Sequence, residues 1–391
     1  MKSNPGMNGT GGIATGTPPQ DGLGAGFWSR HPLWTEFCRD QLPIILAVFL
    51  AGLAVCYWSY GFLPGLETPF PVAGVKVPVW HLVWLGSWTG YTMGIVGEAS
   101  GIFALPYCMS ILQFNSVAVS PTTLLVTFLN PFGALLGFWR ARQWNLDLAL
   151  WLCIGAVIGS PIGPFVRVYI LSEPVPFKAL IGIALLGMGV HLWAQITPWY
   201  LRKTARQRAF KEKFDRMMDA SRAAGCAPSG LPADFRIVTL ERSLGHVCIS
   251  YWDEERRLSV PVMVALGFVI GVVASAFGVG GGFILVPALV TFFELPLYVL
   301  VAATIPFVIV LSATSLISYG FILPALTGMS TPTDWAFGLF VASGAVFGAW
   351  LASKTQRYVP EKYLKPMLGT ITGGVGFLYV LNYFHRLPFQ I

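Results

Sequence analysis

Charged side chains are scarce in this chain. Lys, Arg, Asp and Glu together make up 11% of its 391 residues, whereas hydrophobic residues make up 55%. This composition excludes an ordinary soluble domain, in which about 25% of the residues are charged. It indicates an all-α integral membrane protein, and the length allows about 10–11 transmembrane helices of about 20 residues each, plus one extramembrane segment.

The sequence also lacks the motifs of common enzymes and metalloproteins. Its six cysteines show no CxxC spacing, and neither His81 nor His191 has a second metal ligand at helical spacing. No phosphate-binding loop, nucleophile elbow or HExxH motif is present. We therefore expect no enzyme activity, no cofactor and no metal site.

The positive charge of the chain is concentrated in one segment. Residues 201–259 hold 12 of the 25 Lys and Arg residues, together with 8 Asp and Glu residues. Basic loops of membrane proteins lie on the cytoplasmic side of the bilayer. The net charge of +7 is therefore explained by the orientation of the chain in the membrane. We expect no nucleic acid partner.

Composition divides the chain into five segments. They are a disordered and interfacial N-terminal segment (1–41), an extra N-terminal transmembrane helix (42–63), a first transmembrane repeat (79–200), a cytoplasmic loop (201–259) and a second transmembrane repeat (260–384). In the loop, residues 203–224 have the composition of a helix, and residues 235–242 and 246–252 that of a β-hairpin. The loop could be an ordered connector or a docking segment for a regulatory partner.

The second repeat contains an apolar run that is too long for one helix. The run covers residues 260–293, about 34 residues against the roughly 20 of one span. Four glycines occur in the five positions from Gly278 to Gly282. Glycine lets the backbone leave the helix, and unwound backbone at membrane depth must face protein or a watery cavity. We therefore expect a broken helix at a functional site.

The same pattern recurs 181 residues earlier. This shift aligns Gly97–Gly101 with Gly278–Gly282 and Thr123 with Thr304. Later in each half, Gly155/Gly159 correspond to Gly344/Gly348, a spacing that lets helices pack closely. Two halves with a helix break at the same position are typical of secondary transporters.

Each repeat contains five apolar pieces, including short ones at 100–112 and 281–293. The odd number predicts two inverted repeats, whose broken, short helices meet near the bilayer midplane. With loop 201–259 inside, alternation also places Arg142 and Lys354 inside. This topology has eleven crossings, with the N-terminus inside and the C-terminus outside.

The short pieces would offer helix N-termini at the two breaks. Such an end carries free N–H groups and a partial positive charge, so it can bind an anion without a basic side chain. The threonines could add hydroxyl groups, although a threonine in a helix often bonds only to its own backbone. The expected substrate-binding residues are Ser100, Gly101, Thr123, Gly280, Gly281, Gly282 and Thr304.

Glu98 is the acidic residue that stands in the first break, where the second repeat has Val279. A carboxylate inside a membrane is costly, so it is expected to carry a proton or to pair with a cation. Glu98 is therefore the candidate residue for coupling transport to an ion or proton gradient. The alternative is a hydrated side chain at the cytoplasmic interface.

The segment GVGGGFILVPAL at 278–289, followed by Ala302-Ala303-Thr304, resembles the sulfite exporter TauE/SafE family. The resemblance covers roughly residues 79–384 and is weaker in the first half, where Glu98-Ala99-Ser100 replaces the glycines. It implies a permease of the cell (cytoplasmic, or inner) membrane for small anions such as sulfite, thiosulfate or sulfonates. The lipid bilayer and a small anionic substrate would be the partners, and the chain could form a homodimer.

Two functions remain open at this point. The first is a secondary transporter for a small, sulfur-containing anion, driven by a proton or ion gradient. The second is a membrane receptor or scaffold that senses a small anion and signals through loop 201–259.

Overall fold

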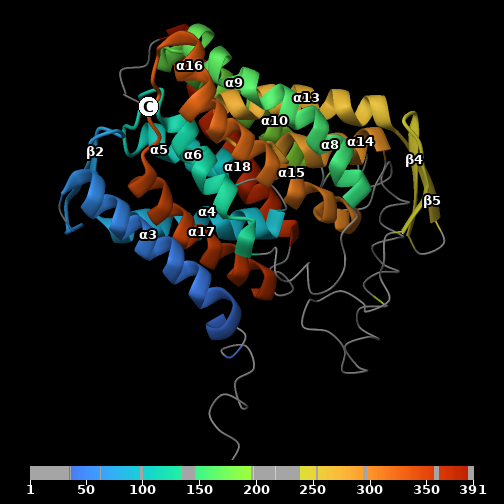
Figure 1. The fold of residues 1–391 in the computed structure, drawn as a ribbon, viewed down its shortest axis with the longest axis horizontal. Helices are drawn as coiled ribbons and strands as arrows, with labels where there is room; N and C mark the ends of the chain where they lie inside the picture. The colour runs from blue at the N-terminus through green and yellow to red at the C-terminus, as the bar shows by residue number, and fades with distance from the viewer. Residues whose placement is uncertain are drawn as a thin grey trace, which may run out of the picture.

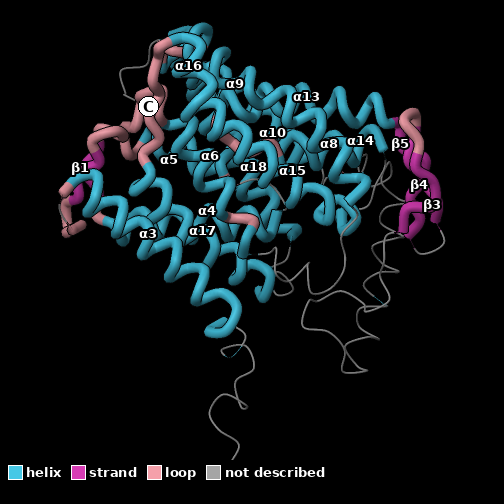
Figure 2. Tube along the Cα trace, viewed as in Figure 1, coloured by secondary structure: helices cyan, strands magenta, loops and turns pink. Residues whose placement is uncertain are grey.

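The computed structural model of the chain describes residues 35, 37–61, 63–96, 100–133, 146–194, 197, 216, 238–251, 254–293, 297–355 and 361–385. Its body is a bundle of helices, with short strands at two opposite ends (Figure 2). The main helices are α3 (Leu42–Tyr60), α4 (Val79–Val96), α5 (Gly101–Ser110), α6 (Val119–Leu129), α8 (Leu146–Gly159), α10 (Pro174–Ala194), α13 (Val260–Phe277), α14 (Gly282–Phe293), α15 (Leu297–Ile317), α17 (Trp335–Thr355) and α18 (Glu361–His385).

Short irregular helices extend three of these elements. They are η1 (Phe37–Gln41) before α3; η2 (Ser160–Ile162), α9 (Gly163–Phe165) and η3 (Val166–Ile170) after α8; and η4 (Ser318–Ile322) and α16 (Leu323–Thr327) after α15. The short helices η2, α9 and α16 each have a proline at their first or second position, where the backbone needs no N–H donor.

Seven helices in the described part of the chain are long and apolar enough to cross a membrane. They are Phe37–Tyr60, Asp147–Ile170, Pro174–Ala194, Val260–Phe277, Ala303–Thr327, Trp335–Ala352 and Pro366–Phe384. Shorter apolar helices occupy Gly101–Ser110 and Val119–Leu129. The chain is thus an all-α, multi-pass membrane protein, while the larger count of about 10–11 spans stays a prediction.

Glycines bring the helices of the two halves into backbone contact. A Cβ atom on Gly344 of α17 would overlap the carbonyl oxygen of Val83 on α4, and a Cβ on Gly155 of α8 would overlap that of Val264 on α13. Val83 and Val264 occupy equivalent positions in the 181-residue repeat. The first helix of each half therefore packs against the fourth helix of the other half.

The last helices of the two halves, α10 and α18, pack against each other in the same way. A Cβ on Gly182 would lie 2.8 Å from the carbonyl oxygen of Gly376, and one on Gly189 would lie 2.8 Å from that of Gly369. Gly182 precedes Gly189 while Gly376 follows Gly369, so α10 and α18 run antiparallel. Their backbones touch at two points about two turns apart.

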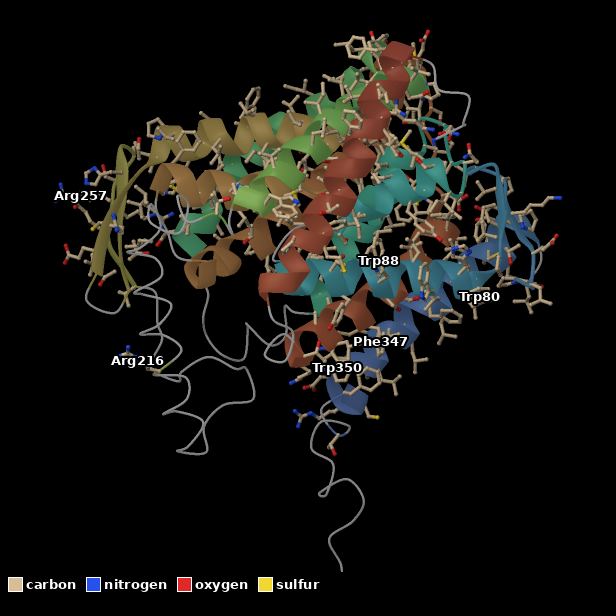
Figure 3. The ribbon with its side chains drawn as sticks, turned by 180° about the vertical axis from the view of Figure 1, so that it is seen from behind. Trp80, Trp88, Arg216, Arg257, Phe347 and Trp350 are labelled. Atoms are coloured by element: carbon tan, nitrogen blue, oxygen red, sulfur yellow. The ribbon has the colours of Figure 1, made fainter. Side chains whose placement is uncertain are left out.

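The N-terminal helix covers one side of α17. The ring of Phe37 lies 4.5 Å from that of Trp350 and 6.1 Å from that of Phe347, between centroids, and Figure 3 shows both α17 side chains beside the start of α3. At the other end of α3, the Tyr60 hydroxyl donates a hydrogen bond of 2.8 Å to the buried carboxylate of Asp334, the residue before α17.

Asp334 also anchors a small hairpin. Strands β1 (Thr68–Phe70) and β2 (Val75–Val77) pair antiparallel, and the amide of Ala73 in their turn donates to Asp334 at 3.1 Å. The amide of Phe337 donates to the same carboxylate at 3.0 Å and so caps the first turn of α17. One buried carboxylate thus joins α3, the hairpin and α17.

A three-stranded sheet lies at the opposite end of the molecule (Figure 1). The strands β3 (Val238–Arg242) and β4 (His246–Tyr251) occupy the region where the sequence predicts a hairpin, and β5 (Glu254–Ser259) adds a strand that was not expected. The helix expected at 203–224 lies outside the described residues, except for Arg216. Strand β5 runs into α13 without a linker, and Arg242 forms a 3.2 Å ion pair with Asp147 in the first turn of α8.

The backbone contact at Gly344 allows us to predict how a substitution there changes the thermal stability of the protein. Gly344→Ala should lower the melting temperature of the detergent-solubilised protein by several degrees, because overpacking costs about 1–3 kcal/mol. Gly374→Ala is the matched control, since a Cβ there meets nothing within 4 Å and alanine favours a helix by about 1 kcal/mol over glycine. Equal melting temperatures for the two variants would contradict the close approach of α4 and α17.

Candidate functional site

The helix of the second half breaks where the glycine cluster predicts it. Helix α13 ends at Phe277, and its C-cap residue Gly278 has a φ of +83°. Gly280 and Gly281 have φ values of +73° and +76°, a region that residues with a Cβ rarely adopt. Helix α14 then begins at Gly282.

Within the part of the chain that the structure describes, the break leaves backbone donors without acceptors. The amides of Gly278 and Val279 both donate to the carbonyl of Ala274. None of the hydrogen bonds among the described residues uses the amides of the next four residues, which are all buried: Gly280, Gly281, Gly282 and Phe283. A buried N–H group without a partner costs about 1–3 kcal/mol. Backbone N–H groups at the start of a helix are donors of the kind that bind anions in proteins.

The first break is described in part. Helix α4 ends at Val96, and Gly97, Glu98 and Ala99 lie outside the described residues, so the coupling role predicted for Glu98 rests on the sequence alone. Ser100 is buried, and its hydroxyl accepts a hydrogen bond of 3.0 Å from the side-chain amide of Asn130.

The structure brings the two breaks together. A Cβ atom on Gly101, the first residue of α5, would lie 2.8 Å from the Cα atom of Val279 and 3.0 Å from the methyl carbon of Thr127. Glycine at position 101 is therefore required for this approach. Helix α5 in turn packs against α6, which lies beside it in Figure 1.

Helix α6 supplies the polar side chains around the second break. A Cβ on Gly278 would lie 2.6 Å from the hydroxyl oxygen of Thr123, and one on Gly280 would lie 2.9 Å from the Cβ of Thr127. The hydroxyl groups of Thr127 and Ser312, on α15, lie 3.2 Å apart and join the two halves. The second break is thus surrounded by α5, α6, α13, α14 and α15.

The two threonines predicted from the repeat differ in their surroundings. Thr123 lies at the break, but its hydroxyl proton is directed to the carbonyls of Val119 and Ser120 in its own helix, so it can offer a substrate only lone pairs. Thr304 is buried on α15, eight residues and about 12 Å along the helix from Ser312.

Arg167 is a polar residue that sequence reasoning missed. Its side chain is fully buried in η3, and its Nε donates a hydrogen bond of 3.1 Å to the hydroxyl of Ser120 on α6. The sequence holds one signal: Arg167 is the sole charged residue between Asp147 and Glu173. A position near the end of a span usually indicates an arginine that reaches the lipid headgroups, and this arginine points inward instead.

A multi-pass helical protein with a buried helix break has the architecture of a membrane transporter. The chain belongs to the sulfite exporter TauE/SafE family, whose sequence profile matches residues 22–192 and, overlapping these, residues 82–379. It is also similar to "Probable membrane transporter protein YunE" of Bacillus subtilis (strain 168), at 23% identity over 288 residues that cover 72% of this chain and 89% of the Bacillus protein.

No solved structure matches the chain. The family confirms the resemblance found in the sequence and makes this protein a membrane transporter rather than an enzyme.

The geometry of the break predicts the effect of filling it. Gly281→Leu should abolish transport while the protein still inserts, because a side chain there meets Ile270 at 2.9 Å and Leu311 at 3.1 Å beside the free amides. Gly328→Leu is the matched control, since Gly328 has a similar φ of +70° but nothing within 4 Å of its Cβ position. Transport by well-expressed Gly281→Leu protein at the rate of the control would remove the site from this break.

Proposed function

We propose that the protein is a secondary transporter that carries a small, sulfur-containing oxyanion, such as sulfite, thiosulfate or a sulfonate, across the cytoplasmic membrane. The observation that carries the proposal is the set of four buried amides without acceptors at Gly280–Phe283. The family's description, which names sulfite, supports the choice of anion.

The chemistry of the break fits an oxyanion. Each of these anions has three oxygens on one sulfur. The three oxygens can together accept several hydrogen bonds from the N–H groups of one short backbone segment. The N-terminus of α14 adds a partial positive charge of about half an elementary charge. The proposed set of binding residues is Ser100, Gly101, Gly280, Gly281, Gly282, Thr123 and Thr304, and the close approach of Gly101 to Val279 supports a contribution from the other half.

The proposal includes two inverted repeats, residues 79–200 and 260–384, joined by a cytoplasmic loop at 201–259. The reciprocal contacts of α4 with α17 and of α13 with α8 support a two-fold relation between the halves. The equivalent helices α10 and α18 run antiparallel, so the two-fold axis is perpendicular to them. For helices that cross a bilayer, such an axis lies in the membrane plane.

Surface labelling tests the inversion. In a chain whose native cysteines are replaced, Arg142→Cys should react with an impermeant maleimide only from the cytoplasmic side, and Thr327→Cys only from the outside. Ser243→Cys, between β3 and β4, is the cytoplasmic control. Reaction of the cysteines at 142 and 327 from the same side would show that the halves are not inverted.

Flux measurements test the substrate and its coupling. Proteoliposomes should accumulate labelled sulfite, thiosulfate or a sulfonate, and a pH gradient should drive the accumulation if a proton moves with the anion. Glu98→Gln imitates a protonated Glu98, so this variant should bind the anion but lose the response to the gradient.

The flux experiment tests the substrate and the coupling role of Glu98 independently. A wild-type protein that moves none of these anions would overturn the substrate. A Glu98→Gln protein that responds to the gradient as the wild type does would remove Glu98 from coupling and leave the substrate in place.

A further inference from the structure

Arg167 carries a positive charge into the interior of the protein. No part of its surface is exposed, and its guanidinium carbon lies 3.7 Å from the centroid of the Phe177 ring. Its Nε donates to Ser120, and its Nη1 donates to the carbonyl of Leu171. Its Nη2 has no hydrogen-bond partner.

The charge of Arg167 is also unbalanced within the described part of the chain. No carboxylate there forms an ion pair with it. Cations buried in proteins are normally paired, because an uncompensated one costs several kcal/mol. The contact with Phe177 offsets only about 1–2 kcal/mol of this cost. Among the described residues, the partners of Arg167 are therefore the neutral groups of Ser120 and Leu171 and the ring of Phe177.

A second unsatisfied group lies in the same region. Ser275, in the last turn of α13, is fully buried, and its hydroxyl has no hydrogen-bond partner. Its neighbour Ala276 accepts a hydrogen bond of 3.1 Å from the Ser120 hydroxyl, and Ser275 itself accepts one of 3.3 Å from the Tyr319 hydroxyl through its carbonyl. Ser120 thus connects Arg167 to the end of α13.

This region adjoins the break. A Cβ atom on Gly278 would lie 2.5 Å from the carbonyl oxygen of Ser120, the residue that Arg167 contacts. Arg167 lies three residues before the end of the candidate span Asp147–Ile170, and Ser275 three residues before Gly278. In the proposed topology this end of α8 is the outer one.

We propose that Arg167 and Ser275 bind the transported oxyanion on the outer side of the helix break, and that Arg167 selects oxyanions over halides. The inference rests on the proposed function and adds a charged group to it. Because Nε and Nη1 already donate to Ser120 and Leu171, the N–H bonds of Nη2 and the hydroxyl of Ser275 are the donors that remain, and the oxygens of an oxyanion accept such directional bonds more strongly than a halide does.

The test measures affinity and selectivity in the full-length protein. Thiosulfate binding to the purified protein in nanodiscs is followed by calorimetry, with bromide as the competing halide. Arg167→Lys keeps the charge but loses the directional N–H donors of Nη2. It should weaken thiosulfate binding at least tenfold and leave bromide binding within about twofold, so the selectivity falls tenfold. A purely structural role would lower both affinities together or neither.

Ser275→Ala tests the same site independently, because its result does not require that Arg167→Lys folds correctly. Removing an unsatisfied buried hydroxyl should not lower the melting temperature, but it should weaken thiosulfate binding about threefold to tenfold. Ser315→Ala is the matched control, because the Ser315 hydroxyl is buried but satisfied by the carbonyl of Leu311 at 2.7 Å. This control should bind thiosulfate as the wild type does.

The outcomes separate the two proposals. Wild-type thiosulfate affinity and selectivity in Arg167→Lys, or wild-type affinity in Ser275→Ala, would overturn the outer site and leave the substrate in place. A wild-type protein that binds neither thiosulfate, sulfite nor a sulfonate would overturn the proposed substrate and the outer site with it.

Discussion

Direct contact between helix backbones is the constraint on which the rest of the structure depends. In a membrane there is little hydrophobic force between helices, so association relies on close packing at small residues. Here the glycines of α17 and α8 admit the carbonyl groups of α4 and α13, which belong to the opposite halves. Each half therefore lacks a complete interior of its own, and the break after Phe277 is covered by helix α6 of the other half.

This dependence explains how the site can hold unpaired polar groups. The free amides at Gly280–Phe283, the Nη2 of Arg167 and the hydroxyl of Ser275 would each be hydrated in an isolated half. Burial between the halves removes water from the break and from the region of Arg167, Ser120 and Ser275 that adjoins it. Because donors dominate there, the region favours an anion and disfavours a cation, and it does so mostly through fixed dipoles that need little reorganisation when the anion arrives.

The sequence predicted those features that depend on local backbone chemistry. Four glycines in five positions predicted the break after Phe277, and the β-branched residues around Leu244 predicted two strands. It could not predict Arg167 or the contact of Thr127 with Ser312, because these depend on which helix faces are turned inward. The same limit applies to Thr304, whose place in the repeat gives no information about its distance from the break. Strand β5, rich in charge, has no apolar alternation by which to recognise it.

The three-stranded sheet fixes one end of two helices. Strand β5 continues into α13, the amide of Val260 donates to the carbonyl of Gly245 in the β3–β4 turn at 3.2 Å, and the ion pair of Arg242 with Asp147 holds the start of α8 to the same sheet. Helix α13 spans about 27 Å between the sheet and the break. Over that length, a tilt of about 5° at the sheet would displace Gly278 by about 2 Å, more than the roughly 1 Å over which a hydrogen bond is lost.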